Sequence, residues 1–131
     1  MGVEKSLELE NAVVSLIDNS IIKIHIKEHA VIEVEDIKKF QEAKKALLDN
    51  PVHYVLFVTP KTGTLTKEAR EFSATPEANL NAKAKAIVVA NLGMRITTNF
   101  FIAMNKPPIL HKAFNNEKQA LEWLREIQKS K

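Results

Sequence analysis

Hydrophobic and polar positions along the chain follow two different periods, which predict strands and helices in turn. Residues 13–17 are mostly apolar, residues 22–26 alternate isoleucine with polar residues, and Asp18-Asn19-Ser20 lies between them. β-Branched residues at a period of two, interrupted by a turn sequence, predict a β-hairpin. Residues 37–47 repeat at helical spacing, and we expect this helix to end at Asp49-Asn50-Pro51.

The rest of the chain continues this alternation of strand and helix. Residues 53–58 and 86–90 are continuously apolar, as expected for strands that are covered on both faces. Further helices are expected from about Thr66, from residue 92 to about residue 105, and after Asn116, with a short strand at residues 109–114. The order β-β-α-β-α-β-α-β-α predicts an α/β fold with about four helices. Its mainly parallel sheet should have about five strands and an N-terminal antiparallel hairpin.

Length and composition bound the organisation of the chain. With 131 residues, of which 45% are hydrophobic and 27% charged, the sequence is typical of one globular domain. Residues 1–10 are polar, so we expect a disordered or frayed N-terminus followed by a single domain over residues 11–131. The longest apolar runs have five residues, far short of the ~20 that span a bilayer, and no secretory signal pattern precedes them. We therefore expect a cytoplasmic protein that is not inserted in a membrane.

Residue counts exclude several kinds of site and partner. The chain has no cysteine, which excludes disulfides, thiolate metal sites and cysteine nucleophiles. Three glycines, at positions 2, 63 and 93, cannot form a glycine-rich phosphate loop. The net charge is +3, and three of the nineteen basic residues are arginine, the residue that makes the commonest specific base contact. We therefore expect no nucleic-acid partner.

Residues 25–29 match H-x-x-E-H, the inverted zinc-peptidase pattern. That chemistry requires a helix, which places both imidazoles on one face. In the strand predicted here His25 and His29 would lie about 13 Å apart, too far to bind one ion. We expect no metal site and no cofactor. Because no catalytic motif occurs elsewhere, we expect a protein that is not an enzyme.

The first candidate site is the loop between the apolar strand at residues 53–58 and the following helix. Anions and ligands bind at such places in open α/β sheets, because free amides and the helix dipole converge there. The alternative is that Thr66 caps the helix and the rest is an ordinary polar turn. The candidate regulatory or anion-binding residues are Thr59, Lys61, Thr62, Gly63, Thr64 and Thr66.

The second candidate is the helix expected at residues 92–105, which is apolar on more than one side. Leu92, Ile96, Phe100 and Ala103 form one stripe, and Met94, Phe101 and Met104 form a second. Such a helix is either covered in the core or offers a surface to a partner subunit or an apolar ligand. The candidate partner or ligand surface consists of Met94, Phe101, Met104 and Trp123.

The order of elements resembles that of the STAS domain, the SpoIIAA-like fold of bacterial anti-sigma-factor antagonists. The C-terminal half is also similar to small uncharacterised bacterial STAS-like proteins, through AKAIVVANLGMR at 84–95, NKPP at 105–108 and ALEWL at 120–124. In the antagonists, the loop before the second helix carries Asp-Ser-Ser/Thr-Gly, whose hydroxyl is phosphorylated by a partner kinase. Here the loop reads Pro60-Lys61-Thr62-Gly63, which keeps the hydroxyl–glycine pair and lacks the Asp-Ser. The resemblance implies Thr62 as the equivalent hydroxyl.

Together these patterns predict a non-catalytic STAS-like regulatory or protein-interaction module, which forms a homodimer or binds a regulatory protein partner. The alternative is a small-molecule or lipid-binding domain that holds an apolar ligand against the helix at residues 92–105. An enzyme without a recognisable motif is the third interpretation.

Overall fold

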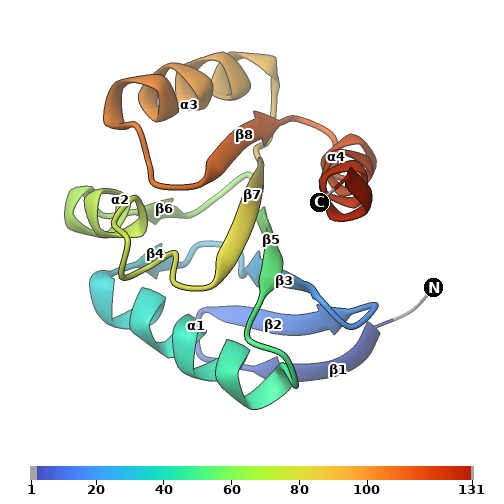
Figure 1. Cartoon of the computed structure of the whole chain (residues 1–131). Helices are drawn as coiled ribbons and strands as arrows, with labels where there is room; N and C mark the ends of the chain where they lie inside the picture. The colour runs from blue at the N-terminus through green and yellow to red at the C-terminus, as the bar shows by residue number, and fades with distance from the viewer. Residues whose placement is uncertain (1–2, 131) are drawn as a thin grey trace.

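A six-stranded sheet is the centre of the computed structural model, which describes residues 3–130 (Figure 1). The strands occur in space in the same order as in the sequence. The first three pair antiparallel and the last four parallel. They are β1 (Val3–Glu8), β2 (Ala12–Ile17), β3 (Ile21–Ile26), β5 (His53–Val58), β7 (Ala82–Val88) and β8 (Leu110–Phe114). Two short strands, β4 (Val31–Ile32) and β6 (Thr64–Leu65), form a separate parallel pair.

Four helices cover the two faces of this sheet. They are α1 (Val34–Leu47), α2 (Lys67–Ser73), α3 (Leu92–Asn105) and α4 (Glu117–Ser130). The first three lie on one face and α4 on the other (Figure 1). The parallel strands follow one another in one direction across the sheet, and right-handed crossovers then place every connecting helix on the same face. This arrangement confirms the predicted α/β fold with its antiparallel hairpin.

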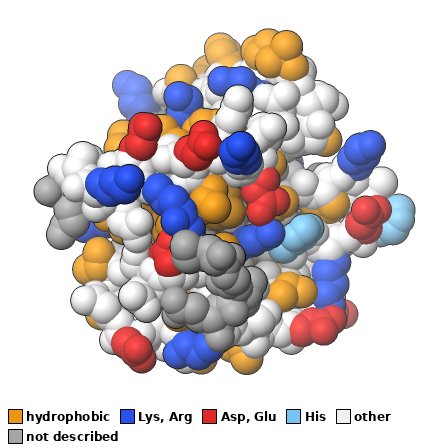
Figure 2. All heavy atoms as spheres, turned by 90° about the vertical axis from the view of Figure 1, so that its right-hand side faces the viewer, with side chains coloured by type: hydrophobic (Ala, Val, Ile, Leu, Met, Phe, Trp, Pro, Cys, Tyr) orange, Lys and Arg blue, Asp and Glu red, His pale blue; other side chains and the backbone are white. Residues whose placement is uncertain are grey.

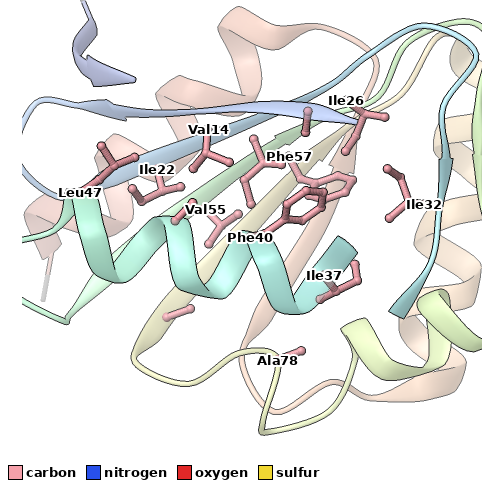
Figure 3. Packing of buried hydrophobic residues seen from close by; sticks show 14 of the residues in the cluster. Val14, Ile22, Ile26, Ile32, Ile37, Phe40, Leu47, Val55, Phe57 and Ala78 are labelled. Atoms are coloured by element: carbon pink, nitrogen blue, oxygen red, sulfur yellow. The ribbon is translucent and has the colours of Figure 1, made fainter. Parts of the chain in front are cut away.

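The two faces of the sheet carry separate hydrophobic cores. All six residues of β5 are buried, which explains its continuous apolar sequence. On the α1 face, Phe40 packs edge-on against Phe57 with ring centroids 6.4 Å apart, and Val55 lies beside them (Figure 3). On the opposite face Leu56 packs in the core that contains Leu124 of α4.

The first strand corrects the expectation that residues 1–10 are frayed. Residues 3–8 form β1, which pairs antiparallel with β2, and the hydroxyls of Ser6 and Ser15 lie 3.3 Å apart. β1 is an edge strand with a largely polar sequence, so it lacks the hydrophobic alternation from which a strand is predicted. It also accounts for the sixth strand of the sheet. Met1 and Gly2 lie outside the described residues.

The predicted helix starts are confirmed by their caps. The Asn91 side chain accepts a hydrogen bond from the Met94 amide at 2.9 Å at the start of α3. Thr66 caps α2 in the same way, at 3.0 Å from the Ala69 amide, and Asn116 caps α4. These caps fix where the loops end and the helices begin.

Candidate functional site

A cavity of about 240 Å³ opens between α2, α3 and the sheet, and we call it the α3 pocket. Its floor is formed by side chains from four adjacent parallel strands. These are Ile26 of β3, Phe57 of β5, Lys85 and Ile87 of β7, and His111 of β8. The pocket therefore lies on the face of the sheet that also carries α1.

The α3 pocket brings together parts of the two candidate regions. From the loop after β5, Thr59, Gly63 and Thr64 line it, whereas Lys61, Thr62 and Thr66 do not. From α3, Met94 and Phe101 line it. These two residues are seven positions apart, so they share one face of the helix. Two segments that the sequence marked separately thus border one cavity.

The other two residues of the candidate surface lie elsewhere. Met104 is 66% exposed and does not line the pocket. Trp123 belongs to α4, on the opposite face of the sheet, where its ring centroid lies 5.6 Å from that of Phe114. The predicted surface therefore does not extend to Trp123. The sequence could not show this, because the side that α4 takes depends on how the chain turns after β8.

The helix α3 lies at the surface and not in the core. None of its residues, all of which the structure describes, is buried. The side of α3 that faces away from the pocket carries Ile96, Phe100 and Met104, and we call it the outer stripe. It is the most exposed part of the helix, since Ile96 is 62% and Phe100 67% exposed. In the view of the α4 face, charges of both signs are interspersed, and hydrophobic side chains gather at the top, at the level of α3 (Figure 2).

Hydrogen bonds from Asn99 attach α3 to the edge of the sheet. Its Oδ1 accepts from the backbone amide of Ala113 at 2.8 Å, and its Nδ2 donates to the carbonyl of the same residue at 3.3 Å. Ala113 lies in β8, the last strand of the sheet. The position of the helix over the pocket therefore depends on polar contacts as well as on packing.

The hydroxyls of the candidate loop make internal contacts. Thr59 Oγ1 donates to the Val88 carbonyl at 2.7 Å, and Thr66 caps α2. Thr62 Oγ1 lies 3.2 Å from a carboxylate oxygen of Glu28 and accepts from a backbone amide. The Thr-Gly pair thus joins this loop to the segment before α1. Anion binding by the loop and phosphorylation of Thr62 stay predictions.

The backbone conformation of this loop explains why glycine occupies position 63. Its φ is +115°, and a Cβ atom at this position would lie 2.9 Å from the carbonyl oxygen of Ala30. Both the dihedral angle and the close approach of a second backbone favour glycine.

Lys85 and His111 place two titratable groups on the pocket floor. Lys85 is half-buried, its Nζ lies 5.0 Å from the centroid of the Phe57 ring, and burial lowers its pKa to about 8. Burial, with the nearby charge of Lys85, lowers the pKa of His111 to about 4. The Nδ1 of His111 lies 3.1 Å from the Ile109 carbonyl and must be its donor, since a carbonyl only accepts. Its buried Nε2 is then an acceptor, and it has no hydrogen-bond partner among the described residues.

A second buried lysine lies next to Lys85. Lys44 of α1 is 7% exposed, and burial together with the charge of Lys85 lowers its pKa to about 7. Among the side chains that the structure describes, neither lysine forms an ion pair. The sheet face beneath α1 and α3 therefore carries positive charge without a carboxylate to balance it.

Sequence reasoning did not find Lys85, His111 or Arg70 as site residues. The alternation of apolar and polar residues in Ala84-Lys85-Ala86 is typical of a strand with one face in water, so Lys85 is expected to be exposed to solvent. A signal was nevertheless present: β7 lies between two other parallel strands, and central parallel strands are covered on both faces. A lysine in such a strand must lie beneath a helix or border a cavity.

Comparison with family models identifies the family of the chain, which its fold alone does not. The family model for DUF7793, a domain of unknown function, matches residues 15–128. The chain belongs to this family. A search of curated proteins finds no match.

A solved structure shares the fold. It is an uncharacterised protein of the DUF3478 family with a SpoIIAA-like fold, from Shewanella loihica PV-4. The two chains are 16% identical and superimpose with a TM-score of 0.53, over 92% of this chain and 90% of the other. The similarity confirms the SpoIIAA-like fold that the sequence predicted.

Residues 3–130 lack two further kinds of feature. Within that range no helix has the length and hydrophobicity needed to cross a membrane. The same residues contain no cluster of three or more His, Asp or Glu side chains placed to hold a metal ion.

Proposed function

We propose that this protein is a non-catalytic module that binds a small, largely apolar molecule in the α3 pocket. One observation carries the proposal: α3 turns apolar side chains toward a cavity instead of packing them into the core. Met94 remains 41% exposed and Phe101 38% exposed. A cavity of about 240 Å³ is close to the lower end of the usual size of ligand pockets, ~300 Å³, and an apolar lining with few polar groups is typical of them.

The attachment of α3 supports entry of a ligand. Because no side chain of this described helix is buried, a small movement of α3 would disrupt little packing. Methionine and phenylalanine on its inner side can adapt to ligands of different shape. The Asn99 contacts with Ala113 hold the helix at the sheet edge while its inner side borders the cavity.

Two adjacent phenylalanines provide a matched test. Phe101 lines the α3 pocket, whereas Phe100 is 67% exposed and does not. Titration with N-phenyl-1-naphthylamine, an uncharged dye that fluoresces in apolar surroundings, should give saturable binding with one site per chain. The substitution Phe101→Ser should weaken binding about ten-fold or more, and Phe100→Ser should leave it unchanged. Absence of saturable binding to the folded protein, or equal losses in both variants, would contradict the proposal.

The second candidate function is protein contact through the outer stripe of α3. Three of its residues, Ile96, Phe100 and Met104, are each more than 60% exposed, which is unusual for large apolar side chains on one helix face. A homodimer or a regulatory partner would cover them. In analytical ultracentrifugation, Phe100→Asp should dissociate a dimer and Phe101→Ser should not. A protein that stays monomeric at several hundred micromolar, with no change in Phe100→Asp, would argue against self-association.

A further inference from the structure

We propose that the molecule held in the α3 pocket is a monocarboxylate with an apolar tail, whose carboxylate binds Lys85 and Arg70. This inference rests on the proposed function and adds the chemical class of the ligand. Both side chains line the pocket, and among the described residues that line it none is acidic. The polar groups of the cavity thus select for negative charge.

Lys85 lacks the partner that an ammonium group in this position needs. It lies at the floor, over the Phe57 ring, and forms no ion pair with any side chain that the structure describes. A charged group that is removed from water without a counter-ion is unfavourable. Lys44 from the α1 side lies near Lys85 but outside the α3 pocket, and the charge of Lys85 helps to lower the pKa of Lys44. An anion that enters the α3 pocket would offset the charge of Lys85.

Arg70 and His111 are the other two ionisable side chains that line the cavity. Arg70 of α2 donates from one Nη to the Leu65 carbonyl at 2.8 Å, which fixes the guanidinium at the pocket wall and leaves its other donors for a ligand. His111 also lines the cavity, and its Nε2 has no hydrogen-bond partner among the described residues.

The rest of the lining determines the other part of the ligand. It is largely apolar, through Phe57, Ile87, Met94, Phe101, Ile102 and Pro107, with uncharged polar side chains at Thr98 and Asn105 of α3. A cavity of about 240 Å³ is near the small end of ligand pockets, so it suits a tail of short or medium length. A carboxylic acid with a medium-length chain, such as octanoate, matches this size. A carboxylate with a phenyl group in its tail shares the same chemistry.

Calorimetric titration at pH 7 with octanoate, 3-phenylpropionate and the uncharged octanamide tests the inference on the full chain. At least one of the two carboxylates should bind at one site, ten-fold or more tighter than octanamide. Comparing the two shows whether the tail is aliphatic or aromatic. Equal binding of octanamide, or binding of neither carboxylate, would overturn the assignment of an anionic ligand.

Lysine variants locate the carboxylate. Lys85→Met should weaken carboxylate binding ten-fold or more and should not weaken binding of N-phenyl-1-naphthylamine, which carries no charge for Lys85 to bind. Lys83→Met is the matched control, because Lys83 lies on the same strand but borders a different hollow, beside Tyr54 and Ile127. An unchanged carboxylate affinity in Lys85→Met would contradict the inference. If the dye binds and the carboxylates do not, this inference fails while the proposed function stands. If nothing binds, both fail.

Discussion

Replacing Lys85 by methionine should make the protein more stable at pH 7, because it removes a charge that the fold holds without a partner. Burial lowers the pKa of Lys85 from 10.5 to about 8, which corresponds to a cost of about 3 kcal/mol for holding the charge. Lys85 borders an open pocket, so water reduces this cost to about 1.5–2 kcal/mol. The lost contact between the ammonium group and Phe57 takes away about 0.5–1 kcal/mol.

The net gain expected from Lys85→Met is therefore about 1 kcal/mol, or about 3–5 °C in melting temperature for a domain of this size. Urea denaturation at several pH values measures it, with Lys83→Met as the control. In the wild-type protein the unfolded chain holds the Lys85 proton up to a higher pH than the folded chain does. Wild-type stability should accordingly rise between about pH 8 and 10.5, and the advantage of the variant should shrink over that range. A variant that is less stable at pH 7, or whose advantage does not change with pH, would refute the reasoning.

Three further predictions concern other parts of the site. Carboxylate affinity, measured by calorimetry at several pH values, should fall as pH rises above about 8, because Lys85 then loses its charge. The ionisable groups around Lys85 are Lys44, Arg70 and His111. Affinity for the uncharged dye should not fall over the same range. Asn99→Ala should destabilise the protein by about 1–3 kcal/mol and speed hydrogen exchange in β8, because it removes both bonds to the backbone of the strand; unchanged exchange would contradict this anchoring role. Gly63→Ala should cost about 1–3 kcal/mol in thermal denaturation, and a neutral effect would show that the loop can relax.

Acid should also weaken the fold, for a reason that involves two histidines. Burial lowers the pKa of His53 and of His111 to about 4, below the ordinary value of 6.5. The unfolded chain therefore binds protons at a higher pH than the folded chain. Stability should fall as pH decreases from about 6.5 to 4. Chemical denaturation at pH 7 and pH 4.5 measures the difference, and equal stabilities at the two values would contradict the burial of neutral imidazoles.

Local signals explain which parts of the fold the sequence predicts. Asn91 and Thr66 cap helices through bonds to amides three residues away, so their role can be inferred from a few neighbouring residues. Strand β5 is apolar from Tyr54 to Val58 because both of its faces are covered. β1 carries no such signal, since it is held at the edge of the sheet by backbone pairing with β2.

The candidate site was predictable in parts but not as a whole. The inner stripe of α3 and the loop after β5 are each visible in the sequence as an apolar or a threonine-rich segment. That they border one cavity follows from the parallel topology, which places the loop and the helix on the same face of the sheet. Lys85 and His111 become neighbours only through the register of β7 and β8, which pairs these two positions. Sequence spacing does not contain that register.

Methionine methyl resonances test the central claim most directly, because the chain has three methionines in distinct places. Met94 lines the α3 pocket, Met104 is on the outer side of the same helix, and Met1 lies outside the described residues. In protein labelled with ¹³C at the methionine methyl groups, titration with octanoate or with N-phenyl-1-naphthylamine should shift the Met94 signal and produce nuclear Overhauser effects from ligand to that methyl. The Met104 signal should stay in place. A ligand that contacts Met104 and leaves Met94 unchanged would contradict binding in the pocket beneath α3.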